Sequence, residues 1–306
     1  MEYLVAVTDN SWYRHLAALL PDEVNFWRPS GNLIKNLQAG APFLSKLHSS
    51  ENYIAGGGFL VRAERLPFPL AWDAFGEKNG ASSFQELRRL IQARGKRSES
   101  DPDIGCLILN EPFFFDRSQW IKAPEDWSRS IVTSKTYSTT EPIGGRLWTR
   151  KELLMLSVPF GKQVSPIVTD GTPLLGAEYL TRSRLGQGAF RILVTGAYKR
   201  RCAISGERTL PVLEAVHIKP FADRGPNRTG NGLLLRSDLH ILFDRGYLTV
   251  SPDYRVEVSR RIKQQFENGK DYDPLHGRPL LVLPDSLDNR PSREFLEWHN
   301  SNVYAG

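Results

Sequence analysis

The stretch LEAVHIKPFADRGPNRTGNGLLLRSDLHILFDRG, residues 213–246, decides how the second half of this sequence is interpreted. Its apolar opening predicts a β-strand that carries His217, and LRSDLHILFDRG predicts a helix that ends at Gly246, a C-cap position. Asn231 lies in the loop between them, and Asp244 follows His240 by four residues. Residues four apart share a helix face, so His240 and Asp244 are expected side by side.

This order of elements suits the hydrolysis of a phosphodiester. The reaction requires a base that activates water and a divalent ion that stabilises charge on the phosphate and the leaving oxygen. A histidine on the strand can be the base, and helix residues one turn apart can hold the ion. Taken singly, each histidine also has a structural explanation as a satisfied core residue. Their joint spacing favours the nuclease interpretation.

The stretch resembles the HNH endonucleases, which have the ββα-metal fold. The resemblance rests on AVHIKP, on the nine residues from Asn231 to His240 in NGLLLRSDLH, and on HILFD. It implies that His217 is the general base, that Asn231 positions the loop of His217, and that His240 binds the metal. It also makes Asp244 a second ligand.

Two positions depart from the family pattern. Many members carry a metal ligand immediately before the base, where this chain has Val216. Glu214 projects from the same strand face and is expected to replace it. Many members also carry paired CxxC motifs that bind a structural zinc ion. Here Ser205 stands where the second cysteine after Cys202 would be, so no structural zinc is expected. The cofactor implied is a divalent ion, Mg²⁺ first, with Mn²⁺ or Ni²⁺ as alternatives.

The segment RLGQGAFRILVTGAYKRRCAISG before the stretch predicts a basic helix and resembles the lead-in of restriction-type HNH nucleases. Cations here can reach DNA phosphates, although a solvated helix face is the alternative. Gln187 and Arg191 are the favoured contacts, because neighbouring glycines let the DNA backbone approach closely. Lys219 and Arg236 flank the site and are expected to contact phosphate as well.

The first half of the chain has a different pattern, of short strands broken by Gly and Pro. Two helices are predicted among them, opening at Asn10 and at Ser83 as N-caps. The predicted strands are Tyr3–Val7, Pro42–Leu47, Tyr53–Arg65, Ile104–Phe115 and Arg146–Trp148. We therefore expect an α+β protein with an N-terminal domain over residues 1–160, a linker over 161–180 and a nuclease domain over 181–306.

The segments AGAPFLSKL, NYIAGGGFLVRAERLP and AWDAFGEKNG resemble the PUA-like superfamily, near its EVE and ASCH branches, over about residues 1–150. The resemblance implies a β-barrel with helices at its edge that binds nucleic acid and accepts a flipped, modified base. Trp27, in a predicted loop, and Phe59 are expected to line the base pocket with Asn25 and Phe43. Arg28 and Lys46 are expected at the DNA backbone. The alternative is that these aromatic residues form the barrel core.

Composition sets wider bounds. The formal net charge of +6 and pI of about 9.3 favour a polyanionic partner. Two cysteines, Cys106 and Cys202, are too few for a disulfide framework or a Cys₄ zinc site. The N-terminus lacks the pattern of a signal peptide and no long apolar run predicts a membrane span. We therefore expect a cytoplasmic protein with no membrane association.

These observations lead to one hypothesis with two alternatives. The hypothesis is a modification-dependent, type IV-like restriction endonuclease that reads 5-methyl- or 5-hydroxymethylcytosine in double-stranded DNA and cuts nearby. A homodimer would let two such sites cut both strands. The first alternative is an HNH nuclease that reads an unmodified sequence or an RNA structure. The second, suggested by Val216, is a catalytically degenerate nucleic-acid-binding protein.

Overall fold

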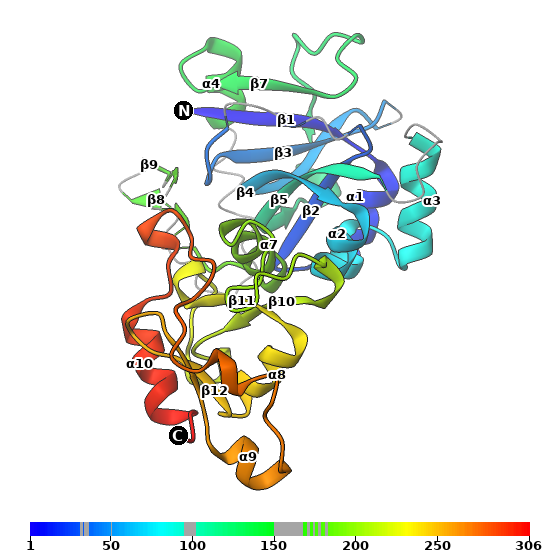
Figure 1. Cartoon of the computed structure of the whole chain (residues 1–306). Helices are drawn as coiled ribbons and strands as arrows, with labels where there is room; N and C mark the ends of the chain where they lie inside the picture. Colours follow the sequence, from blue (N-terminus) through cyan, green and yellow to red (C-terminus); the bar gives the residue numbers. More distant parts are fainter. Residues whose placement is uncertain are drawn as a thin grey trace. The chain divides into compact units, whose positions relative to one another are not determined.

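The computed structural model describes residues 1–30, 33, 37–49, 51–94, 102–149, 168–169, 172–173, 175–176, 179–180 and 183–306. The chain divides into two compact units, Met1–Gly186 and Gln187–Gly306. Most of the expected linker, residues 161–180, lies outside the described residues. Each unit mixes helices and strands, which confirms the α+β class (Figure 1).

One curled sheet organises the N-terminal unit. Its seven strands are β1 (Glu2–Thr8), β2 (Glu23–Arg28), β3 (Pro42–Leu47), β4 (Tyr53–Pro67), β5 (Asp103–Phe114), β6 (Ile121–Lys122) and β7 (Ser134–Ser138). They follow the order β2-β5-β4-β3-β1-β7, with β6 paired to β4. Arg28, on the first strand of this order, donates a hydrogen bond of 3.0 Å to Ser134 on the last. The sheet therefore curls until its two ends approach each other.

The glycines of β4 permit close contact between strands. A Cβ atom on Gly56 would lie 2.2 Å from the carbonyl oxygen of Phe113, and one on Gly57 would lie 2.1 Å from that of Phe43. The register between β4 and β5 shifts between Gly57 and Phe59, so this run forms a β-bulge. The glycines are thus explained by packing of the backbone.

The helices of the N-terminal unit are α1 (Asn10–Leu19), α2 (Phe68–Phe75), α3 (Phe84–Arg94) and α4 (Pro142–Thr149). Helix α1 is capped by Asp9, one residue before the expected cap, because its Oδ1 accepts the N–H groups of Ser11 and Trp12. Ser83 caps α3 as predicted, by accepting the N–H of Glu86 at 3.2 Å.

Two predictions about local structure in this unit were wrong. The expected strand Arg146–Trp148 lies inside α4, where Ile143 and Leu147 share one face and pack against the core cluster around Tyr3. Trp27, expected in a loop, lies on strand β2, which pairs with β5 from Glu23 to Arg28. Both errors come from short segments whose structure is fixed by neighbours distant in sequence.

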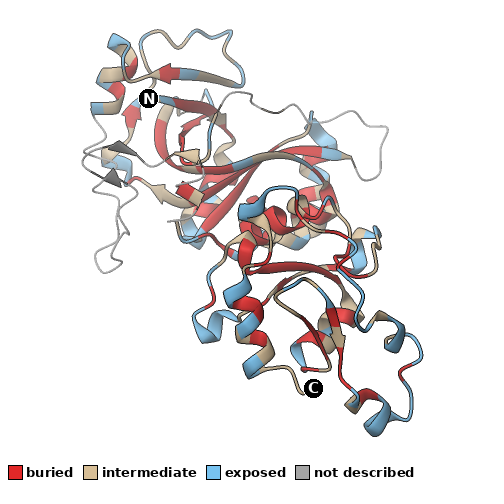
Figure 2. Cartoon of the chain, turned by 60° about the vertical axis from the view of Figure 1, so that its left-hand side comes forward, coloured by how far each residue is buried: buried red, intermediate tan, exposed pale blue. Residues whose placement is uncertain are grey.

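The C-terminal unit is built from small elements around one apolar core. Its main elements are α7 (Gln187–Ala197), β10 (Leu213–His217), β11 (Gly232–Arg236), α8 (Ser237–Asp244), β12 (Leu248–Val250), β13 (Val256–Val258), α9 (Arg261–Phe266) and α10 (Arg293–Asn302). Figure 2 shows buried positions along its strands and the inner faces of its helices. Strands β12 and β13 form a hairpin, and Phe295 and Leu296 dock α10 in the core.

Cys202 joins two segments of this unit through its sulfur atom. The chain after Cys202 forms a turn, in which the cysteine sulfur accepts hydrogen bonds from the N–H groups of Ser205 at 3.4 Å and Arg236 at 3.3 Å. The sulfur thereby links the turn to the end of β11. Within the described residues, every helix is too short or too polar to cross a bilayer.

Candidate active site

Two antiparallel strands and the following helix form the frame of the site. The ladder between β10 and β11 runs from Leu213 opposite Arg236 to His217 opposite Gly232. The intervening loop, residues 218–231, returns the chain across the end of the ladder, and α8 starts directly after β11. This strand–loop–strand–helix order is the ββα arrangement that the resemblance implies, although strand β11 was not predicted from the residue pattern.

His217 lies at the end of β10 with its ring held on two sides. The ring stacks on that of Phe190, from α7, with centroids 3.9 Å apart and planes inclined by 11°. Its Nε2 lies 2.7 Å from Oδ1 of Asn227. Burial lowers the pKa of His217 below its ordinary value, so the neutral, basic form dominates at neutral pH.

Asn231 braces the loop that follows His217. It is fully buried, and its Oδ1 accepts the N–H of Lys219 at 2.9 Å. Its Nδ2 donates to the carbonyl oxygens of Lys219 at 2.9 Å and Pro226 at 3.0 Å. Because one amide joins both arms of the loop, it fixes the end of β10 relative to Pro226. This geometry matches the positioning role that the resemblance implies for Asn231.

His240 connects two carboxylates. Its Nε2 lies 3.0 Å from Oδ2 of Asp244, one turn later on α8, and its Nδ1 contacts Oε2 of Glu214 on β10. The hydrogen bonds that the ring donates to Asp244 and to Glu214 together outweigh burial and raise the pKa of His240 to about 9. The two carboxylates therefore lie on different sides of the imidazole ring.

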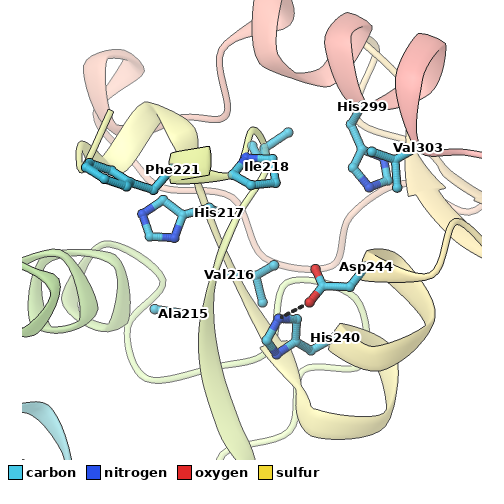
Figure 3. A pocket seen from close by; sticks show the side chains of 10 residues that line it. Ala215, Val216, His217, Ile218, Phe221, His240, Asp244, His299 and Val303 are labelled. Carbon is cyan, nitrogen blue, oxygen red and sulfur yellow. Dashed lines mark ion pairs between the residues drawn. The ribbon is translucent and has the colours of Figure 1, made fainter. Parts of the chain in front are cut away.

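A pocket of about 410 Å³ brings these groups together. Figure 3 shows His217, His240 and Asp244 around it, with His299 from α10 and Val303, just after that helix, on a further side. Phe221, from the loop after β10, is also part of the lining and is 72% exposed. The pocket thus contains a basic histidine opposite a histidine–carboxylate pair.

The donor set of this pair, one imidazole nitrogen and one carboxylate, would suit a divalent ion. Among the described residues, no three or more His, Cys, Asp or Glu side chains are grouped as a complete metal cage. Mg²⁺ keeps several waters and takes one or two carboxylates from a protein, so Asp244 could hold it, whereas the imidazole of His240 is the kind of ligand that Ni²⁺ favours. Glu214, at the opposite ring nitrogen, is placed to orient His240, as carboxylates beside metal-bound histidines commonly do.

Val216 has a packing role. Its side chain is 1% exposed and belongs to the apolar core cluster of the unit. It contributes no ligand atom. Glu214, two residues earlier, is the side chain of this strand that reaches His240 and also accepts a hydrogen bond of 3.0 Å from the Ser237 hydroxyl.

The residues expected at the DNA backbone have mixed surroundings. Gln187 is exposed at the start of α7, and Arg191 is half-buried on the same helix. Lys219 lies over the ring of Trp298, with Nζ 5.4 Å from its centroid. Arg236 makes a bidentate pair with Asp238, at 2.6 and 2.8 Å. The guanidinium of Arg236 is thus already engaged by a neighbouring carboxylate.

In the N-terminal unit, Arg28 and Lys46 are both withdrawn from solvent. Arg28 is half-buried on Ser134, and Lys46 is 3% exposed, with Nζ 5.2 Å from the ring centroid of Trp127. Burial lowers the pKa of each side chain. Their positions give little surface for a phosphate in this conformation.

The residues expected in the base pocket do not converge. Asn25 is fully buried and Trp27 is 9% exposed; their side chains donate to Oδ1 and to the backbone oxygen of Asn79, each at 2.9 Å. Phe43 packs on Phe26. Because side chains alternate along a strand, Phe26 points to the face of β2 opposite to that of Asn25 and Trp27. The remaining residue, Phe59, is half-buried. Asn25, Trp27 and Phe43 are therefore placed as packing residues.

Sequence reasoning missed three residues of the site, Phe190, Asn227 and His299. Phe190 lies in a helix expected to bind phosphate, and Asn227 in a polar loop without periodicity. His299, from the C-terminal helix, stacks on Phe243 with centroids 3.7 Å apart. The loop after His217 contains two asparagines, Asn227 and Asn231. Their presence is the one signal in the sequence that a second amide side chain, besides Asn231, contributes to the site.

Comparison with known proteins agrees with this frame. Residues 202–251, within the C-terminal unit, match the family model described as HNH endonuclease. None of the curated proteins matches the chain.

Two solved structures are similar to parts of the chain. The ASCH protein ZmASCH of Zymomonas mobilis has 8% identity and a TM-score of 0.35, covering 48% of this chain and 96% of that one. The modification-dependent restriction endonuclease TagI has 14% identity and a TM-score of 0.30, covering 92% of this chain and 75% of that one.

Proposed function

We propose that this HNH domain makes the protein a metal-dependent DNA endonuclease, with its active site in the pocket between β10, α8 and α10. One observation carries the proposal. His217 faces the same pocket as His240 Nε2 and Asp244, and all three lie in the segment that matches HNH endonucleases. A base and a metal-binding pair on opposite sides of a pocket are what phosphodiester hydrolysis requires.

His217 would act first as the base. It takes a proton from a water molecule as the water oxygen forms a bond to phosphorus, and the bond from phosphorus to the leaving sugar oxygen breaks. Burial favours the neutral ring that this step needs. Asn231 holds the end of β10 so that the ring keeps its place, and the leaving oxygen takes up a proton from solvent.

His240 and Asp244 would hold the divalent ion. When bound, the ion neutralises charge on the phosphate oxygens and the leaving oxygen. Without an ion, the raised pKa of His240 keeps its ring protonated at neutral pH. Binding of an ion at Nε2 would require the loss of the Nε2 proton, and the Nδ1–H group would then donate a hydrogen bond to Glu214, which would keep Nε2 as the ligand atom.

Cleavage of supercoiled plasmid DNA by the full chain tests the proposal. We expect nicked and linear products in Mg²⁺ or Mn²⁺ and none with a chelator. A His48→Ala variant, which changes an exposed histidine of the N-terminal unit, serves as a matched control and should cleave like the wild type. Absence of cleavage in every divalent metal would sink the enzyme claim and favour a degenerate binding protein.

A finer proposal concerns the N-terminal unit. We propose that it targets the nuclease to DNA that contains a modified cytosine, 5-methyl- or 5-hydroxymethylcytosine, in keeping with its sequence resemblance to PUA-like domains. An HNH core alone has little selectivity, and a second unit of this size is available for recognition. A homodimer would place two nuclease sites on one duplex.

Cleavage of three DNAs that differ only in their cytosine, which is unmodified, 5-methylated or 5-hydroxymethylated, tests the recognition of modified cytosine against the alternatives. The proposal predicts preferential cleavage of the 5-methyl or 5-hydroxymethyl substrate over unmodified DNA. Equal cleavage of all three substrates would contradict it and favour recognition of an unmodified sequence. Preferential cleavage of structured RNA would favour the RNA alternative.

A further inference from the structure

An amide side chain contacts the ring of His217 at the nitrogen farther from the backbone. Oδ1 of Asn227 lies 2.7 Å from Nε2. The carbonyl oxygen of its neighbour, Pro226, accepts a hydrogen bond of 3.0 Å from Asn231. Since Asn231 also binds both backbone groups of Lys219, one buried residue holds the two chain segments that present His217 and Asn227.

The chemistry of this contact selects one form of the ring. An amide oxygen only accepts hydrogen bonds, and a neutral imidazole carries a single proton. The proton of His217 must then be on Nε2, which leaves the lone pair on Nδ1. Phe190 fixes the plane of the ring by stacking at 3.9 Å, so rotation and tautomer are both constrained.

We infer that Asn227 is a positioning residue that holds His217 in the tautomer whose Nδ1 accepts the proton from water. The inference rests on the proposed endonuclease function. In this inference, the Oδ1 atom of Asn227 fixes the tautomer by accepting the Nε2 proton of His217 in a hydrogen bond. A purely structural Asn227 would instead act on the loop, and its effect would not depend on an acceptor at Nε2 or on pH.

Substitution by aspartate separates these roles. Aspartate keeps an acceptor at Nε2 but adds a negative charge, which favours the protonated ring and raises the pH at which the base becomes active. The titratable groups that face His217 from neighbouring elements are His240 and Asp244 on α8 and His299 on α10. From α7, the neutral ring of Phe190 stacks on the imidazole, and these neighbours are the same in every variant.

The experiment is single-turnover cleavage of plasmid DNA by the full chain between pH 5.5 and 9, at saturating Mg²⁺. We expect Asn227→Ala to lower the rate at least about tenfold with unchanged DNA affinity. Asn227→Asp should recover most of the rate at high pH, with the acid limb of its profile moved upward. Asn289→Ala, which removes the 2.7 Å hydrogen bond from Thr229 in the same loop, is the control and should cleave like the wild type.

Three results would overturn the inference. If the wild type cleaves and Asn227→Ala matches its rate and pH profile, Asn227 has no part, and the proposed function stands. If the aspartate and alanine variants, both with wild-type melting temperatures, are equally slow at every pH, the amide supports the loop alone. If the wild type itself cuts no DNA, the proposed function fails and this inference fails with it.

Discussion

Nε2 of His240 lies 3.0 Å from Oδ2 of Asp244, on the side of the ring that faces the pocket of His217. Glu214 contacts the other nitrogen of the same ring. A single histidine thus has one carboxylate placed to share an ion and another placed to hold its proton. Glu214 and Asp244 were both expected from the sequence as metal ligands, but they lie at different nitrogens of the His240 ring.

Glu214 and Asp244 should respond differently to removal. We expect Glu214→Ala to weaken metal affinity about 10- to 100-fold, as for other residues that orient a ligand, with cleavage largely recovered at high Mg²⁺. Asp244→Ala should leave cleavage low at every Mg²⁺ concentration. The measurement is cleavage rate against Mg²⁺ concentration, and the same unrecoverable loss in both variants would make Glu214 a direct ligand.

His299 should make the stability of the C-terminal unit depend on pH. Burial lowers its pKa to about 4, while it binds Thr249 through Nδ1 at 2.8 Å. Between about pH 4 and 6.5 the unfolded chain therefore binds more protons at this site than the folded chain. The contribution of neutral His299 to the free energy of unfolding is complete above pH 6.5. It falls by up to about 3 kcal/mol as the pH decreases towards 4.

Chemical denaturation of wild type and His299→Gln at several pH values checks this. The variant should be less stable at pH 7.5, because the histidine is buried and hydrogen-bonded. Its free energy of unfolding should fall less than that of the wild type between pH 7.5 and 5. Parallel curves for the two proteins would show that His299 does not titrate in this window.

Trp27 is expected to stabilise the fold of the N-terminal unit. Replacing a buried tryptophan by alanine costs about 3–5 kcal/mol, and Trp27→Phe should cost about 1–3 kcal/mol by leaving the carbonyl oxygen of Asn79 without its donor. Val132→Ala, at a position 74% exposed, is the control. A Trp27→Ala protein with wild-type melting temperature and lost selectivity for modified cytosine would restore the base-pocket role.

The sequence predicted best what is encoded locally. His217, Asn231, His240 and Asp244 lie within one short stretch, where strand and helix patterns and fixed spacing bring them together. Trp27 was misplaced because β2 is a six-residue strand followed by Pro29, and its structure depends on pairing with β5.

The rest of the site depends on tertiary contacts. Phe190 and His299 come from helices that precede and follow the ββα frame, and no local pattern reports what a helix will pack against. Asn227 lies in a loop whose path is set by hydrogen bonds from Asn231. The roles of these residues could be assigned only once the folded chain placed them against His217 or Phe243.

The central claim is that His217 is the base of a DNA endonuclease, and one measurement tests it most directly. Single-turnover cleavage of supercoiled plasmid in saturating Mg²⁺ is compared for wild type and His217→Ala, with DNA affinity measured in parallel. The account predicts a rate loss of about 10²- to 10⁴-fold in the variant with unchanged affinity and melting temperature. Equal cleavage rates in the two proteins would contradict it.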